Sequence, residues 1–118
     1  MTAAKLNLPA IEKGATYRHT LIWKDKNNVP VNLTDCTAKI QVREDIASDM
    51  VLLEVSTENS YLVITSLSGK IDFYIPDEDT KTLLTEGGVY DLEIYHPNGD
   101  VTRLSKGTWI FIDEVTRD

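Results

Sequence analysis

The chain has one cysteine, Cys36, and only two histidines among its 118 residues. A single cysteine excludes an intramolecular disulfide and a zinc site built from several thiolates. Cys36 is therefore expected to be a small residue of the core or of a strand edge rather than a reactive thiol. His19 and His96 each lack a second ligand at a suitable spacing, so we expect neither metal binding nor catalysis from them.

Basic residues are also scarce, because 12 Lys and Arg stand against 19 Asp and Glu and the net charge is −7. An acidic surface without a basic stripe repels phosphate backbones, so nucleic-acid binding is not expected. No apolar run approaches the length that crosses a membrane, and the first residues lack the apolar segment of a signal peptide. These features predict synthesis in the cytoplasm and no membrane partner.

The motifs that carry catalysis are missing as well. No serine lies in a Gly-x-Ser-x-Gly turn, and Gly87-Gly88 is too short to cradle a phosphate. The acids at 77–79 lack the further ligands and the glycine of a calcium loop, and they fit the first turn of a helix. Four more carboxylates are expected on outward faces of strands, as solvated acids rather than a pair for sugar hydrolysis: Glu54, Asp72, Asp91 and Glu93. The chain is therefore expected to be no enzyme and to bind no metal or cofactor.

Short alternating segments separated by turns make up most of what is present. Apolar and polar residues alternate over 16–23 and in three later inward rows: Ala38, Ile40 and Val42; Ile71, Phe73 and Ile75; Tyr90, Leu92 and Ile94. Turn signals recur about every ten residues, which is typical of an all-β sandwich or barrel. Pro30 confines a short strand at 29–33 to a sheet edge, and Lys106-Gly107 is expected to break the last strand.

One helical turn is expected to interrupt the strands at about residues 77–84. Asp77 fits its N-cap, Leu83 and Leu84 fit its buried face, and Gly87-Gly88 fits its end. No repeat, low-complexity tract or linker divides the remainder. We therefore expect one β-sandwich domain over 15–118, preceded by an extended N-terminal arm over 1–14.

Gly88 and Tyr90 follow this helical turn in an arrangement known from immunoglobulin-like sandwiches. There, a tyrosine two residues before an inward strand position ties its hydroxyl to the preceding loop. Tyr90 stands two residues before Leu92, so Gly88 and Tyr90 predict a corner lock. The pattern favours an immunoglobulin-like antiparallel β-sandwich, while another small Greek-key topology stays open.

Two apolar segments are candidates for an interface with another protein. Leu6, Leu8 and Ile11 lie in the arm without a helical period, and the arm either frays or docks on a neighbouring subunit. Trp109 and Phe111 lie in a run that is apolar on both faces and so must be covered on both sides. The arm or a partner would supply that cover, and ordinary core packing is the alternative.

Five short motifs occur in an order that spans about residues 7–117: P-V-x-L-T at Pro30–Thr34, A-x-I-x-V-R at Ala38–Arg43, T-x-x-L at Thr80–Leu83, Y-D-L-E at Tyr90–Glu93 and V-T-R at Val115–Arg117. This order resembles that of small proteins encoded in the structural gene clusters of tailed phages. The resemblance implies an immunoglobulin-like β-sandwich of the virion or tail, in a family whose members mostly have no assigned activity.

The resemblance further implies a non-enzymatic structural or adaptor protein located in the virion, at the tail, baseplate, neck or capsid surface. Its partners would be other virion proteins and copies of itself. An alternative comes from the aromatic residues, which could form a platform on a carbohydrate- or receptor-binding module. The partner would then be a cell-surface glycan or receptor, and Trp23 and Trp109 would carry the contact.

Overall fold

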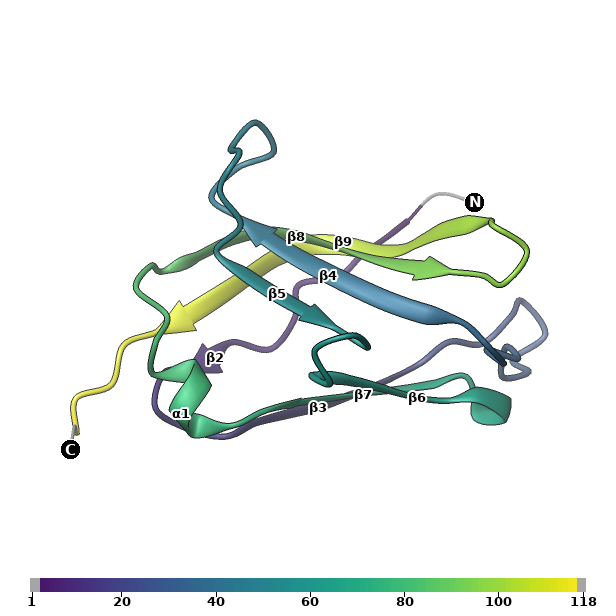
Figure 1. Cartoon of the computed structure of the whole chain (residues 1–118), viewed down its shortest axis with the longest axis horizontal. Helices are drawn as coiled ribbons and strands as arrows, with labels where there is room; N and C mark the ends of the chain where they lie inside the picture. Colours follow the sequence, from purple (N-terminus) through teal and green to yellow (C-terminus); the bar gives the residue numbers. More distant parts are fainter. Residues whose placement is uncertain (1–2, 117–118) are drawn as a thin grey trace.

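A computed structural model describes residues 3–116, which fold into two facing β-sheets (Figure 1). The larger sheet contains β1 (Ala4–Lys5), β2 (Ile11–Glu12), β4 (Thr37–Arg43), β5 (Leu53–Ser56), β8 (Gly87–Tyr95) and β9 (Val101–Ile112). The smaller sheet contains β3 (Tyr17–Ile22), β6 (Leu62–Thr65) and β7 (Lys70–Ile75). Arg117, the last residue of the V-T-R motif, and the outermost residues of the expected arm and domain lie outside the described residues.

The strand order confirms an immunoglobulin-like antiparallel β-sandwich. The larger sheet runs β1-β9-β8-β4-β5, with β2 also on β9, and the smaller one runs β3-β7-β6. Neighbouring strands are antiparallel except for β1 and β2, which both run parallel to β9. Strands β3, β7 and β6 thus take the places of strands B, E and D of that fold, and β4, β8 and β9 take those of C, F and G.

The alternating rows of the sequence form the core, as expected. Residues 38, 40 and 42 of β4, 71, 73 and 75 of β7, and 90, 92 and 94 of β8 are all buried. Trp109 of β9 is fully buried at the centre, and its ring meets those of Tyr17, Tyr90, Phe73 and Phe111 at centroid distances of 5.6–6.5 Å. Most of these contacts are edge-to-face, the geometry that aromatic quadrupoles favour.

The helical turn is shorter than expected. A single turn, α1 (Asp77–Thr80), follows Pro76, and the next amides bond three residues back, from Thr82 to Asp79 and from Leu83 to Thr80. Leu83 is buried but Leu84 is almost fully exposed, so only one of the two leucines faces the core. A short 3₁₀ turn, η1 (Ser66–Ser68), separates β6 from β7.

Two other expectations about strands are wrong. Residues 29–33 form no strand and contribute only an isolated bridge between Lys24 and Pro30. Strand β9 continues through Gly107. The glycine is needed there because the N-terminal arm passes close by: a Cβ would lie 2.4 Å from the carbonyl oxygen of Leu6. The register shift in β9 comes earlier, opposite Leu92 and Glu93.

The N-terminal arm belongs to the same sandwich over its described residues. The amides of Leu6 and Leu8 donate to the carbonyls of Lys106 and Thr108, and Ile11 pairs with Phe111. Leu8 and Ile11 point into the core and are buried. The arm therefore covers the free edge of β9 within its own chain.

Candidate interaction surface

Most of the five residues expected at an interface lie in the core. Leu8, Ile11, Trp109 and Phe111 are buried in the core, and only Leu6 is partly exposed, at 39%. The prediction is thus wrong for four of the five, because Trp109 and Phe111 face inward and the arm of the same chain covers them. Within the apolar run 109–112 of β9, the residues that face outward are Ile110 and Ile112, whose exposed fractions are 50% and 47%.

Tyr90 fastens the arm rather than the corner that precedes it. Its hydroxyl donates to the carbonyl oxygen of Leu6 at 2.5 Å, and it lies 3.2 Å from the Oγ of Ser105. Tyr90 stands opposite Gly107 in the pairing of β8 with β9, so the missing side chain leaves room for the phenol to reach the arm. The corner lock predicted that Tyr90 would hold the loop just before it. This is wrong, because the group that Tyr90 holds lies 84 residues away in the sequence.

The carbonyl of Pro9 is a second point at which aromatic side chains hold the arm. Trp109 Nε1 donates to this oxygen at 3.0 Å and the hydroxyl of Tyr17 donates at 2.9 Å. Burial raises the pKa of Tyr17 to about 12, and burial also raises the pKa of Tyr90. Both phenols therefore remain protonated donors at neutral pH.

Gly88 has a steric role in the sheet. A Cβ at this position would lie 2.0 Å from the carbonyl oxygen of Arg43, the last residue of β4. Gly87 has φ +99°, and a Cβ there would lie 2.1 Å from the carbonyl oxygen of Trp109. The two glycines thus allow β8 to run close to both neighbouring strands, and they leave a stretch of the sheet without side chains.

Cys36 and His96 lie in contact, although their spacing in the sequence indicates no pair. The Sγ of Cys36 lies 3.6 Å from Nδ1 of His96, whose Nε2 lies 2.9 Å from Oγ1 of Thr102. Burial, followed by the charge of Asp35, raises the pKa of the Cys36 thiol, which keeps it protonated and a weak nucleophile. The pairing of β4 with β8 creates this contact across 60 residues, and sequence spacing holds no signal for it.

The described residues do not form the aromatic platform that the carbohydrate- or receptor-binding alternative requires. Within residues 3–116, no three His, Cys, Asp or Glu side chains are grouped so that they could hold a metal ion. Trp109 is fully buried and Trp23 packs partly against the core, so the two tryptophans form no exposed pair. No helix in this part of the chain is long and apolar enough to span a membrane.

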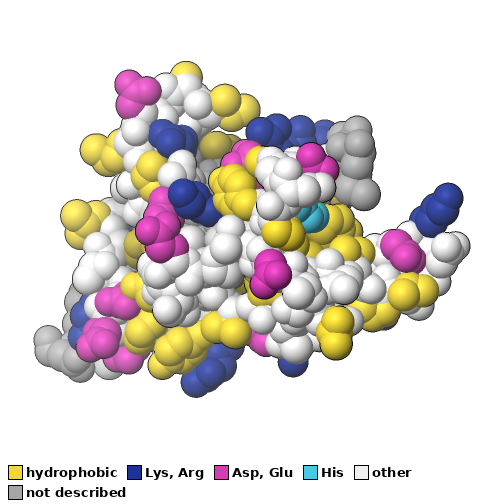
Figure 2. All heavy atoms as spheres, turned by 45° about the vertical axis from the view of Figure 1, so that its right-hand side comes forward, with side chains coloured by type: hydrophobic (Ala, Val, Ile, Leu, Met, Phe, Trp, Pro, Cys, Tyr) yellow, Lys and Arg dark blue, Asp and Glu magenta, His cyan; other side chains and the backbone are white. Residues whose placement is uncertain are grey.

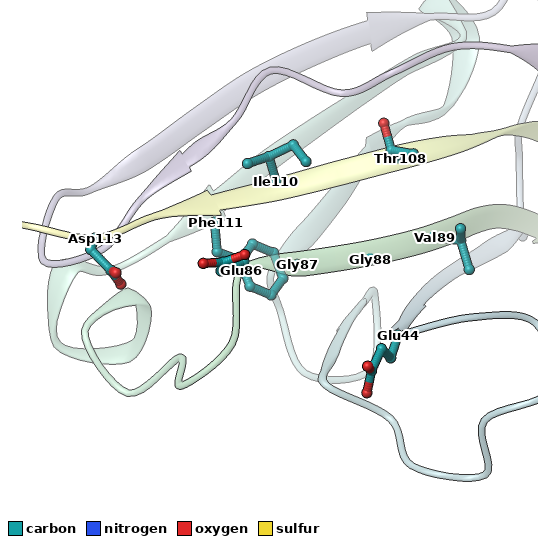
Figure 3. A pocket seen from close by; sticks show the side chains of 9 residues that line it. All are labelled: Glu44, Glu86, Gly87, Gly88, Val89, Thr108, Ile110, Phe111 and Asp113. Carbon is teal, nitrogen blue, oxygen red and sulfur yellow. The ribbon is translucent and has the colours of Figure 1, made fainter.

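The outer face of the larger sheet carries two adjoining hollows, which we call the outer groove. One has a volume of about 490 Å³ and is lined by Gly87, Gly88 and Ile110, among others (Figure 3). The other, of about 750 Å³, reaches Ile46 of the loop between β4 and β5. Val89 and Thr108 line both hollows, so the groove is continuous along β8 and β9.

The two ends of the outer groove differ in chemistry. At the first hollow, Ile110 and Thr108 project from one side of β9 and Phe111 from the other, beside the bare backbone of Gly87 and Gly88 (Figure 3). Three carboxylates, of Glu44, Glu86 and Asp113, also line this hollow, so its apolar surface has an acidic rim. Six charged side chains line the second hollow: Lys5, Arg43, Asp91, Glu93, Arg103 and Lys106. Figure 2 shows hydrophobic side chains on the loop that projects from the larger sheet, and basic side chains beside it.

Ion pairs organise the charged end. Arg103 lies 3.2 Å from Asp91 and 3.6 Å from Glu93. Burial raises the pKa of Asp91, the charge of Glu93 adds to this, and Arg103 and Arg43 oppose it. Arg43 also donates to the carbonyl of Ser48, which ties the projecting loop to the sheet. The groove is therefore lined by both apolar and charged side chains.

No protein-family model and no curated protein matches this chain. Among solved structures, it is similar to extracellular domains 3–5 of Drosophila OTK, with 14% identity and a TM-score of 0.39. That match covers 97% of this chain and 35% of the OTK structure, so the chain spans about a third of it. It is also similar to Tim-1, with 8% identity, a TM-score of 0.41, and coverage of 99% and 100%. Likenesses of this strength carry no argument about function.

Proposed function

We propose that this protein is a non-enzymatic structural or adaptor protein of a tailed-phage virion, and that it assembles with other virion proteins through the outer groove. The order of motifs over residues 7–117 supports the setting, through its resemblance to small phage structural proteins. The observation that carries the proposal is the first hollow of the groove, where Ile110 remains half exposed beside bare glycine backbone.

The groove exposes apolar side chains that a partner could cover. Ile110 is 50% exposed and Ile46, which overhangs the other hollow, is 91% exposed. Removing apolar surface from water contributes roughly 25 cal/mol per Å², so a partner that covers Ile110 in one hollow and Ile46 in the other stabilises the contact at both places. Gly87 and Gly88 let a side chain of that partner approach the backbone closely. The ion pairs of the charged end would then set the orientation of the partner.

Ile110→Lys tests this role, with Val101→Lys as its matched control. Both residues are apolar, both belong to β9, and their exposed fractions are 50% and 54%. Val101 does not line either hollow, so its replacement leaves the groove intact. Each variant gene replaces the parent gene in the phage genome. Particles are then purified on a density gradient, and the amount of the protein in them is measured by mass spectrometry.

We expect the parent protein and Val101→Lys in the particles at equal amounts, and Ile110→Lys reduced at least about tenfold, because the variant removes the apolar surface of the hollow and the contact must strip water from the new charge. Circular dichroism and thermal unfolding of the purified variants check that both fold like the parent. Absence of the parent protein from particles would refute the virion role. Equal incorporation of Ile110→Lys would refute the groove as the assembly surface.

A further inference from the structure

The edge strands of the two sheets differ in whether another group hydrogen-bonds to their outward backbone. The edge of β9 is occupied by β1 and β2 of the same chain. The edge of β5 is occupied by a side chain: Asn59 Oδ1 accepts from the amide of Ser56 at 3.0 Å, and Asn59 Nδ2 donates to the carbonyl of Glu54 at 2.8 Å. An asparagine side chain thus stands in for the next strand. Such blocking is expected where edge-to-edge pairing would otherwise follow.

The edge of β3 has no such cover. The amide of Trp23 donates to the carbonyl of Gly69, and the amide of Tyr74 donates to Tyr61 on the opposite side of β7. Because backbone groups alternate along an antiparallel strand, residues 17, 19 and 21 face β7 and residues 18, 20 and 22 face outward. The outward N–H and C=O groups of Arg18, Thr20 and Ile22 have no partner within residues 3–116.

One register lets these three residues pair with their own copies. If Thr20 lies opposite Thr20 of a second chain, Arg18 lies opposite Ile22 and Ile22 lies opposite Arg18. Every outward-facing residue of β3 then gains a hydrogen-bonded partner within the strand, while a shift of two residues in either direction leaves one without a partner inside β3. The centred register also avoids facing arginines, since like charges directly opposite destabilise a pair and threonine pairs are favourable.

The side chains on this face fit the same register. Ile22 is 53% exposed on the outer face of the smaller sheet. The guanidinium of Arg18 lies 4.5 Å from the centroid of the Tyr74 ring, so Arg18 is held over an aromatic surface. Across the two-fold axis, Ile22 of one chain would meet the Arg18 stem and the Tyr74 ring of the other. The contact covers apolar surface at both ends of the pair.

We propose that β3 pairs antiparallel with β3 of a second copy of this chain, centred on Thr20, so that two three-stranded sheets become one continuous six-stranded sheet. The inference deepens the assembly role proposed above, which supplies its setting, by naming the edge and the partner. An isologous contact of this kind closes on itself and gives a two-fold dimer.

Thr20→Lys and Thr65→Lys form the test pair. Both threonines are exposed and occur on edge strands of the smaller sheet, Thr20 on β3 and Thr65 on β6. In the proposed register Thr20→Lys sets two ammonium groups opposite each other, whereas Thr65→Lys changes nothing at β3. Sedimentation equilibrium over a concentration series measures the dimerisation constant of the isolated protein.

We expect the parent and Thr65→Lys to dimerise with the same constant and Thr20→Lys to dimerise at least about tenfold more weakly. A parent chain that stays monomeric throughout, or a Thr20→Lys variant that dimerises like the parent, overturns the proposal. This experiment and the particle experiment can fail separately. A dimeric protein that is absent from particles refutes only the virion role. A monomeric protein that is present in particles refutes only the pairing of β3.

A cross-linking measurement covers the case in which Thr20→Lys fails to fold. Hydrogen-bonded antiparallel pairs have Cα atoms about 5.5 Å apart, which lies within the range that a disulfide spans. In a Cys36→Ser background, Thr20→Cys should therefore form a disulfide-linked dimer under mild oxidation much faster than Thr65→Cys. Equal rates for the two variants would overturn the register.

Discussion

Replacing Tyr90 with phenylalanine should loosen the N-terminal arm while leaving the core packed. The ring stays in place against Trp109, whose centroid lies 6.2 Å away, so the change removes only the hydroxyl. That hydroxyl holds the carbonyl of Leu6 at 2.5 Å and lies 3.2 Å from the Oγ of Ser105. Leu6 is partly exposed and regains a bond from water, but Ser105 is buried and loses the hydrogen-bond partner described for it.

The size of the effect follows from these two bonds. A typical hydrogen bond contributes about 1 kcal/mol net, and a buried polar group left unpaired costs about 1–3 kcal/mol. We therefore expect Tyr90→Phe to lower the free energy of unfolding by about 2 kcal/mol. With a urea m-value of about 2 kcal/mol/M, the midpoint falls by about 1 M.

The assay must show that the loss is located in the arm. Native-state hydrogen exchange reports the amides of Leu6 and Leu8, which donate to Lys106 and Thr108. If Tyr90 is the fastening, these two amides should exchange about tenfold or more faster in the variant, since about 1.4 kcal/mol corresponds to a factor of ten. The exchange rates of the amides that join β4 to β8 should rise only as much as the lower global stability requires.

Tyr74→Phe is the matched control for this prediction. Tyr74 lies on the outer face of β7, its hydroxyl makes no hydrogen bond within residues 3–116, and its ring keeps the contact with Arg18 after the change. The control should leave the urea midpoint unchanged. If Tyr90→Phe behaves like Tyr74→Phe in both the midpoint and the exchange of the arm amides, the reasoning about the arm is wrong.

Two further predictions concern the edge of β5 and the stability of the protein at alkaline pH. Asn59→Ala should expose the backbone of β5 and raise light scattering on concentration, whereas Asn98→Ala in the exposed hairpin turn should not; equal scattering would contradict the blocking role. Burial raises the pKa of Tyr17 from 10.0 to about 12, so its stabilising contribution is complete below pH 10 and is lost as the pH rises through 12. Tyr17→Phe should therefore flatten the fall of the urea midpoint between these pH values, and an unchanged slope would contradict the assignment.

The strands that alternate strictly were predictable because a period of two fixes which side faces the core. This is why the inward rows of β4, β7 and β8 are confirmed. The run from Trp109 to Ile112 is apolar at every position, so the sequence held no information on which pair faces inward. The cover for the inward pair comes from the arm, about 100 residues away in the chain, and no local pattern reports that contact.

The outer groove and the Cys36–His96 contact were missed for a related reason. Each depends on the register between strands: Thr37 pairs with Tyr95, which brings Cys36 beside His96, and Gly88 pairs with Trp109. The sequence did indicate the two glycines, but as the end of a helix. Their actual role is close backbone approach, which becomes visible only once β4 and β9 are placed on either side of β8.

The pairing of the arm with β9 also sets the order in which the chain can complete its fold. Leu6 bonds to Lys106 and Lys13 bonds to Ile112, so the first strands wait for the last one to be synthesised. Until β9 has been synthesised, Leu8 and Ile11 lack the strand on which the arm docks. The larger sheet therefore closes late, because the arm is made first and must wait for β9.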